Sequence, residues 1–290
     1  MNKRDVVLIN PGGFYAQVVA RFTSAIQRHL PSVIVENTPS EGSFNVHFFR
    51  ERIDAETRQP RKHPDLYIAH GWCQKLGASH YQAMDSFRYA GVPGPMVEEF
   101  LVSEGMKRQK IVTVGHPGMD DTINGWHTPP INDGGKPRLV VAFTHTEFIN
   151  YWNRMDPSFK ESLREKYNVI EVTHPAFGWR MSRDYIKGAA VVLSEKSGTI
   201  FEAWTFGVPV VFPTWAFGSP RFKPGAPLQQ IYTQEIGYHV DKAEHFRSII
   251  DLAAEQGITP EETKFIDEYF PAELRGNSGE VAANAILERL

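Results

Sequence analysis

The 290-residue sequence has a single cysteine, Cys73, and little excess of either charge. One cysteine excludes an internal disulfide and a cluster of thiolate metal ligands, which suits a reducing compartment. No apolar run approaches the roughly twenty residues that a membrane-spanning helix needs, and the amino terminus lacks the charged-then-apolar pattern of a signal peptide. The sequence therefore predicts a soluble, cytoplasmic protein with no transmembrane segment.

Several signatures of catalysis and metal binding are also missing. There is no GxGxxG turn after the first apolar run, no GxxxxGK[ST] loop and no GxSxG turn, which argues against a dehydrogenase, a P-loop kinase and an α/β-hydrolase. HExxH and paired ligands at zinc spacing are absent, so we expect no metal. Asp120 and Asp121 are a candidate magnesium pair, but a helix N-cap is the favoured interpretation.

The formal net charge of −3 gives no overall attraction to a polyanion, so nucleic acid would need a local basic face. Two basic clusters are candidates, and a solvated surface is the favoured interpretation of each. They are Arg58, Arg61 and Lys62, and Arg180, Arg183 and Lys187.

Hydrophobic residues make up 41% of the chain, enough for a sizeable core. Short apolar runs alternate with amphipathic segments, which is typical of α/β folds. We expect strands over 5–10, 32–36, 66–69, 110–114, 138–143, 169–172, 189–193 and 208–212, and a last one within 232–240. Helices are expected over 15–30, 97–104, 157–166, 243–256 and 279–290, and from about 197 to a stop at 207. Residues 40–64, with one short element around 48–53, and 213–227 are expected to be loops.

The stretch 128–137, TPPINDGGKP, has three prolines, two glycines and no apolar periodicity, which is typical of a linker. Strands and helices alternate on both sides of it. We therefore predict two Rossmann-like domains, residues 1–130 and 137–290, that face each other across a cleft, with the last helix able to pack back on the first domain.

The segment 191–212, VVLSEKSGTIFEAWTFGVPVVF, predicts a strand, a tight turn, a helix and a second strand. Backbone N–H groups and the positive end of the helix dipole meet at such a turn, and anions bind there. Ser197, Gly198 and Thr199 would add hydroxyls and close backbone approach, and Glu202 lies about one turn further, within reach of a ribose hydroxyl. The alternative is an ordinary βαβ unit with a serine cap.

Three histidines, His70, His116 and His174, follow predicted strands in turns with glycine or proline. Imidazole is suited to take a proton from an attacking hydroxyl, or to stabilise a phosphate leaving group when protonated. A hydrogen-bonded structural role is the alternative for each of them.

Four groups of residues, in the same order along the chain, match motifs of one family. They are His70-Gly71 with Lys75; Gly115, Pro117 and Asp120; His174-Pro175; and Ser194, Ser197, Glu202, Gly207 and Pro209. On these residues the chain resembles the CDP-glycerol glycerophosphotransferases, the teichoic-acid-type polymerases and primases, within the GT-B glycosyltransferase class. The resemblance covers residues 66–212.

The resemblance implies a GT-B-like α/β fold whose second half holds a nucleotide-activated donor and whose first half holds the acceptor. It implies transfer without a metal or other cofactor, with His70 as general base and His174 at the donor phosphates. The donor-binding candidates are Ser194, Ser197, Gly198, Thr199, Glu202, His116 and Thr144, and the acceptor-side candidates are Gly12, Gly13, Lys75 and Asp120. The transferred group would be a sugar or a polyol phosphate from a CDP-glycerol-like or UDP-sugar donor, and the acceptor a polyanion, a glycan or DNA.

The chain departs from the family at two places. Gly118 replaces an arginine that usually follows the proline, and Glu195 and Lys196 stand where an aspartate often precedes the serine-rich turn. The turn is also similar to that of the non-hydrolysing UDP-N-acetylglucosamine 2-epimerases. An epimerase, a transferase for modified bases of phage DNA, and a binding module without catalysis therefore stay as alternatives.

Overall fold

The chain forms two compact units in a computed structural model. The first comprises Met1–Asn124 and Asp267–Leu290, and the second Gly125–Ile266. The described residues are 5–10, 12, 16–48, 65–69, 71–72, 81, 84–127, 131–143, 146–172, 182–217 and 224–290. The chain leaves the first unit after Asn124 and returns within one helix, α12 (Pro260–Tyr269).

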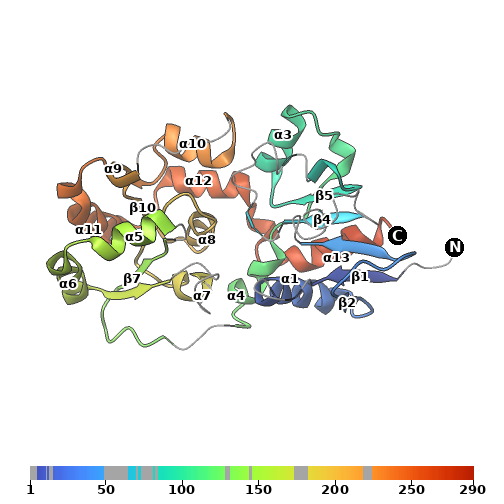
Figure 1. Ribbon diagram of the computed structural model, residues 1–290, viewed down its shortest axis with the longest axis horizontal. Helices are drawn as coiled ribbons and strands as arrows, with labels where there is room; N and C mark the ends of the chain where they lie inside the picture. The colour runs from blue at the N-terminus through green and yellow to red at the C-terminus, as the bar shows by residue number, and fades with distance from the viewer. Residues whose placement is uncertain are drawn as a thin grey trace. The chain divides into compact units, whose positions relative to one another are not determined.

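The first unit contains a parallel sheet of six strands in the order β2-β1-β3-β4-β5-β6 (Figure 1). Their bounds are β1 (Val6–Ile9), β2 (Ile34–Glu36), β3 (Phe44–His47), β4 (Leu66–Ile68), β5 (Tyr89–Val92) and β6 (Ile111–Thr113). All four residues of β1 are buried, as expected for an inner strand of a parallel sheet covered on both faces.

Helices α1 (Ala16–His29) and α13 (Ser278–Leu287) pack closely against each other beside this sheet. A Cβ at Gly279 would lie only 2.5 Å from the carbonyl oxygen of Ala25, so only glycine allows this approach. The unit's other helical segments are α3 (Pro95–Ser103), α4 (Asp120–Ile123) and 3₁₀ turns at Arg108–Lys110, Pro117–Met119 and Ala272–Leu274.

The second unit contains a parallel sheet of five strands in the order β11-β10-β9-β7-β8. The strands are β7 (Arg138–Val141), β8 (Asn168–Glu171), β9 (Val191–Leu193), β10 (Val210–Phe212) and β11 (Tyr238–His239). Its helices are α5 (Thr146–Arg154), α6 (Pro157–Lys166), α7 (Ser182–Ile186), α8 (Thr199–Thr205), α9 (Thr214–Phe217), α10 (Pro227–Thr233) and α11 (Phe246–Gln256), with a 3₁₀ turn at Ala243–His245.

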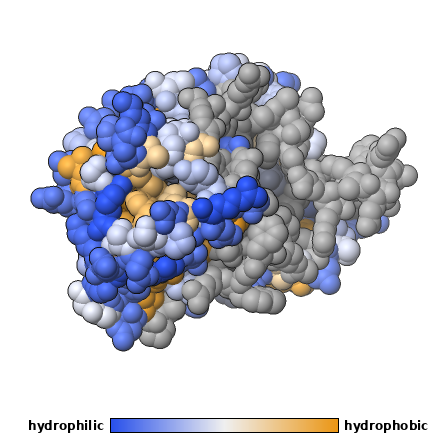
Figure 2. Space-filling model, turned by 60° about the vertical axis from the view of Figure 1, so that its left-hand side comes forward, coloured by the Kyte–Doolittle hydropathy of each residue, from blue (hydrophilic) through white to orange (hydrophobic). Residues whose placement is uncertain are grey.

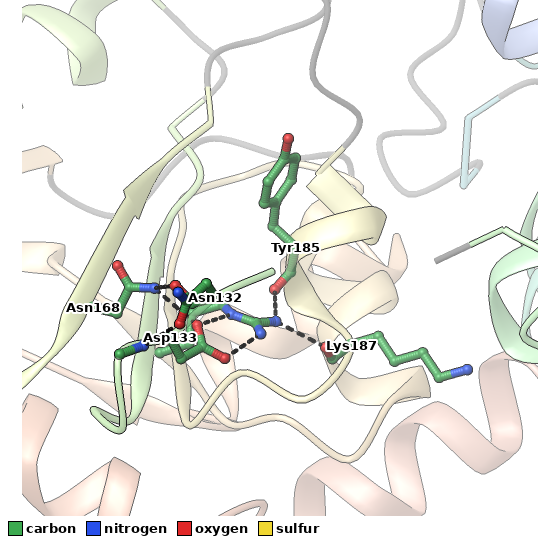
Figure 3. A network of polar contacts seen from close by, with 7 residues as sticks. Asn132, Asp133, Asn168, Tyr185 and Lys187 are labelled. Carbon is green, nitrogen blue, oxygen red and sulfur yellow. Dashed lines mark hydrogen bonds and ion pairs between the residues drawn. The ribbon is translucent and has the colours of Figure 1, made fainter. Parts of the chain in front are cut away.

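A buried arginine lies at the amino end of this second sheet. Figure 3 labels the residues around it, among them Asp133, Asn168 and Tyr185. Arg138, the first residue of β7, donates from two nitrogens to the carboxylate of Asp133 and from a third to the carbonyl oxygens of Tyr185 and Lys187, at 2.9 and 3.0 Å. Asn168 of β8 donates to the same carboxylate at 2.8 Å. The network ties the carboxyl end of α7 to β7 and to the preceding linker.

The alternation of strands and helices predicted from the sequence is confirmed, with differences in two expected loops and in five further elements. Residues 40–64 were expected to be a loop, but β3 lies within them, between β1 and β4. Residues 213–227 were also expected to be a loop, but α9 begins at Thr214. Strand β5 and helices α5, α7, α10 and α12 were not foreseen.

The compact units can be compared with the predicted ranges 1–130 and 137–290. The division falls after Asn124, just ahead of the proline-rich linker, and residues from Asp267 onward belong to the first unit. The last helix thus belongs to the first unit, the arrangement that the sequence left open.

On the face shown in Figure 2, most of the coloured residues are hydrophilic, with a smaller group of hydrophobic ones among them. None of the helices in the described ranges combines the length and apolar character that a bilayer crossing requires.

Candidate functional site

The strand order gives each sheet one topological switch point. In the second sheet the chain goes from β7 to β8 on one side, then crosses to β9 on the other side of β7. In open α/β sheets, ligands bind beyond the carboxyl ends of the two strands at such a point. Ser194 directly follows β9, and its hydroxyl contacts the carbonyl oxygen of Ala142, which follows β7, at 3.5 Å. The serine-rich turn therefore lies at the switch point.

The turn itself is compact and mostly buried. The amide of Ser197 donates to the carbonyl oxygen of Glu195 at 2.7 Å, and the hydroxyls of Ser194 and Ser197 lie 3.1 Å apart. From Ser194 to Thr199, only Lys196 and Gly198 are partly exposed. The turn thus combines backbone amides and small hydroxyls with one lysine, Lys196, and one buried carboxylate, that of Glu195.

Helix α8 begins at Thr199, two residues later than the predicted start, because Gly198 is its N-cap. Gly198 provides no side-chain cap. Within the described part of the chain, no acceptor is hydrogen-bonded to the amides of Gly198, Thr199 or Ile200. Such amides at a helix start are donors suited to an anion.

Glu202 lies one turn into α8 and is nearly buried. Its Oε2 accepts a hydrogen bond from the hydroxyl of Ser182 at 2.5 Å, and its Oε1 lies 3.6 Å from Nε of Arg183. Arg183, expected at a solvated surface, is instead buried in this ion pair. The sequence missed both partners because α7 has no strong helical pattern.

Two further side chains lie at the carboxyl end of the sheet without having been singled out from the sequence. The His239 ring stacks on Phe212 with 4.7 Å between centroids, and Tyr232 packs edge-on against His239 at 5.5 Å. Burial lowers the pKa of His239, and burial together with the Glu195 carboxylate raises the pKa of Tyr232. Both groups are therefore neutral at pH 7. No local motif marks them, since they come from a short strand and a separate helix.

The switch point of the first sheet lies between β1 and β3. Gly12, an acceptor-side candidate, follows β1 there, and its amide donates to Oδ1 of Asn10 at 3.1 Å. Its φ of +72° explains the glycine, because other residues rarely adopt that conformation.

His116 and Asp120 are buried within the first unit. The ring of His116 packs against those of Trp72 and Phe22, with ring centroids 4.2 and 4.9 Å away. The carboxylate of Asp120 accepts from the amides of Ser278 and Gly279 at 3.3 and 2.6 Å, so it caps α13. The structure thus gives both residues a packing role, and their donor and acceptor roles stay predictions.

Other predicted site residues lie outside the described residues. They are Gly13, His70, Lys75, Thr144 and His174. The described ranges contain no group of three or more histidine, cysteine, aspartate or glutamate side chains arranged to hold a metal ion.

No protein-family model matches the chain, and no curated protein matches it. The structure is similar to that of the wall teichoic acid polymerase TagF soaked with CDPG, with a TM-score of 0.69 and 10% identity over 99% of this chain and 88% of that chain. It is also similar to a putative UDP-N-acetylglucosamine 2-epimerase from Listeria monocytogenes, with a TM-score of 0.53 and 11% identity over 99% of this chain and 97% of that chain. The S. aureus MnaA–UDP structure gives a TM-score of 0.54 at 12% identity, with 99% and 97% covered.

These likenesses confirm the predicted α/β fold with two Rossmann-like units, and they confirm the resemblance to the teichoic-acid-type GT-B proteins at the level of the fold. Identities of 10 to 12% leave activity to be argued from the site.

Proposed function

We propose that the protein is a GT-B transferase that moves a sugar or polyol-phosphate group from a nucleotide-activated donor to an acceptor hydroxyl. The observation that carries the proposal is the turn Ser194–Thr199 at the switch point between β7 and β9. This is the position where doubly wound sheets bind nucleotides.

The turn is suited to a diphosphate. The amides of Gly198, Thr199 and Ile200 and the dipole of α8 favour negative charge, and Lys196 adds a cation on the partly exposed side of the turn. A departing nucleotide gains negative charge on its phosphate as its bond to the transferred group breaks. Fixed donors at that phosphate would stabilise the transition state more than the ground state.

The reaction is a displacement at the donor. The acceptor hydroxyl gives its proton to His70 and forms a new bond either to the β-phosphorus of a CDP-glycerol-like donor or to the anomeric carbon of a nucleotide sugar. The leaving group is CMP in the first case and the nucleoside diphosphate in the second. His174 and the turn would carry its charge, and a glycan, a polyanion or DNA would supply the hydroxyl.

A second candidate is a nucleotide-sugar epimerase, which the fold likeness to the two epimerase structures supports. The higher TM-score with TagF favours the transferase. Incubation with UDP-N-acetylglucosamine alone separates the two, because an epimerase needs no acceptor and would produce an epimerised sugar.

The transferase proposal is tested first by donor binding. We expect one nucleotide class among CDP-glycerol, CDP-ribitol, UDP-sugars and GDP-sugars to raise the unfolding temperature, since a ligand that binds only the native state stabilises it. Ser197→Ala should weaken that binding by about tenfold, the cost of one hydrogen bond to a charged group. Ser248→Ala is the control, because it removes an exposed hydroxyl in α11 that donates to the backbone carbonyl oxygen of His245. The proposed site would be contradicted if no donor raised the unfolding temperature, or if Ser197→Ala and Ser248→Ala bound the donor with equal affinity.

A further inference from the structure

Helix α7 provides both partners of the Glu202 carboxylate. The hydroxyl of Ser182 donates to one oxygen, and the guanidinium of Arg183 lies beside the other. The side chains of Arg183 and Glu202 are only 4% and 8% exposed. A buried ion pair of this kind loses so much hydration that it stabilises a fold little, but it fixes the orientation of both groups.

The far end of α7 is fixed as well. The carbonyl oxygens of Tyr185 and Lys187 accept from Arg138, which is itself held by Asp133 (Figure 3). Ser182 and Arg183 are therefore presented to α8 from a helix anchored to the amino end of β7. The position of the Glu202 carboxylate depends on this anchored helix.

The carboxylate of Glu202 has capacity left for a ligand. An ionised carboxylate offers about four acceptor positions. In the described part of the chain, Ser182 supplies one hydrogen bond and Arg183 one ion pair, and this carboxylate has no other hydrogen bond or ion pair. One lone pair on each oxygen thus stays available to two neighbouring hydroxyls, the pattern that a ribose diol presents.

Glu202 also lies at a suitable distance along α8 from the turn. Thr199 and Glu202 are three residues apart, so they lie on the same face of the helix. A nucleotide whose phosphates bind at Thr199 would bring the group next to its phosphates, the ribose, toward Glu202.

We propose that Ser182 and Arg183 are positioning residues that aim the Glu202 carboxylate at both ribose hydroxyls, so that α7 sets the preference for ribonucleotides over deoxyribonucleotides. This inference rests on the proposed function and extends it to the recognition of the donor sugar. Ser182 and Arg183 act through Glu202 and make no contact with the reacting atoms.

The test is calorimetry of the full chain with UDP, CDP and GDP, followed by the 2′-deoxy and 3′-deoxy forms of the one that binds. We expect the wild-type chain to bind each deoxy form about 10- to 100-fold more weakly, since each lacks one hydrogen bond to a charged group. Ser182→Ala should reduce this preference by about threefold or more, while affinity for the deoxy forms changes little. Ser182→Thr keeps the hydroxyl and should retain the preference.

Ser158→Ala is the matched control, because its hydroxyl also donates to a carboxylate, that of Asp156 at 2.8 Å, in the same unit. If Ser182 had only a structural role, Ser182→Ala would weaken the binding of all nucleotides alike and leave the preference intact. That result would overturn the inference, while the proposed function would stand. A wild-type chain that binds a nucleotide without discriminating against its deoxy forms overturns it too. Failure of all three nucleotides to bind overturns the proposed function, and this inference with it.

Discussion

At the scale of single residues, the surroundings of His116 could not be predicted. Its place after a strand, in a turn with glycine and proline, was compatible with a role in chemistry and with a structural role. In the structure His116 is 3% exposed, and its ring packs against those of Trp72 and Phe22. The sequence could not reveal this, because Phe22 is 94 positions before His116 and local patterns carry no information about such contacts.

Gly118 has a steric explanation. A Cβ at this position would lie 2.4 Å from the ring of Phe22, which is fully buried. An arginine in place of Gly118 would not fit against α1. The glycine at this position therefore fits the packing of the first unit.

Asp120 gives a prediction on pH dependence. Burial raises its pKa to about 7, and this outweighs the amides of Gly279 and Ser278, which favour the charged form. Since the folded-state pKa lies above the unfolded value of 3.8, its contribution to stability is complete below that value and is lost as pH rises toward 7. Asp120→Asn keeps an acceptor for α13 but does not titrate. We expect the free energy of unfolding of this variant, relative to that of the wild-type chain, to rise by about 2 to 4 kcal/mol between pH 4 and pH 7.5.

Urea unfolding at several pH values measures this difference. Asp85→Asn is the control, because Asp85 is exposed, lies in the same unit and pairs with Lys110 at 2.7 Å. That variant should keep the pH profile that Asp120 produces. If the free energy of unfolding varied with pH in the same way for Asp120→Asn and the wild-type chain, the raised pKa assigned to Asp120 would be contradicted.

At the scale of elements, one glutamate both caps α12 and joins it to its neighbours. Thr259 and Glu262 form a capping box: the Glu262 amide donates to the Thr259 hydroxyl at 3.1 Å, and the Thr259 amide donates to Oε2 at 2.8 Å. The other oxygen of Glu262 accepts from Trp204 of α8 and from the amide of Val210 of β10. One buried side chain thus joins the start of α12 to α8 and β10, and burial raises its pKa.

Glu262→Ala should destabilise the protein strongly. The change leaves the indole N–H of Trp204 and the amide of Val210 buried without an acceptor. It also removes the acceptor of the Thr259 amide, which is one half of the capping box of α12. We expect a loss of about 3 kcal/mol or more in the free energy of unfolding, measured in urea. Glu261→Ala is the matched control, since Glu261 is exposed in the same turn and its loss should change stability by less than about 0.5 kcal/mol. Equal losses in the two variants would contradict the role given to Glu262.

Strand β3 was missed in the sequence because polar residues interrupt its apolar pattern. Strand β3 has only four residues, FNVH, with two polar ones, yet all four are buried between β1 and β4. Asn45 tolerates burial because its amide bonds to Ser40 and Ser43, at 3.0 and 3.2 Å. A polar residue satisfied by its surroundings disrupts the apolar pattern on which strand prediction depends.

At the scale of the whole molecule, the chain passes from the first unit to the second and back. The returning segment is bound to the 115–124 turn: Ser278 accepts from the amide of His116, and Gly276 accepts from Asn124. Asp120 caps α13 from the same turn. The C-terminal residues therefore complete the first unit, not the second.

Removing residues 276–290 should loosen the first unit selectively. Without α13, the buried face of α1 loses its cover and Asp120 loses its partners. We expect backbone amides of β1 and β3 to exchange with solvent at least about tenfold faster, while those of β7 and β9 keep their protection. Hydrogen exchange followed by mass spectrometry measures both units at once. Removal of 288–290 leaves α13 intact and should change neither. Faster exchange in both units, or in neither, would contradict this division.

The sequence by itself determined the alternation of strands and helices, the presence of two α/β halves and the place of the serine-rich turn after β9. Those properties depend on local signals: apolar periodicity, glycine and proline stops, and short motifs. Only the tertiary structure decided the order of the strands, and with it the fact that this turn lies at a switch point. It also decided the partners of Asp120 and Glu202, which lie 159 and 20 positions away along the chain. Such contacts form because packing brings distant segments together, and no local pattern encodes which segments meet.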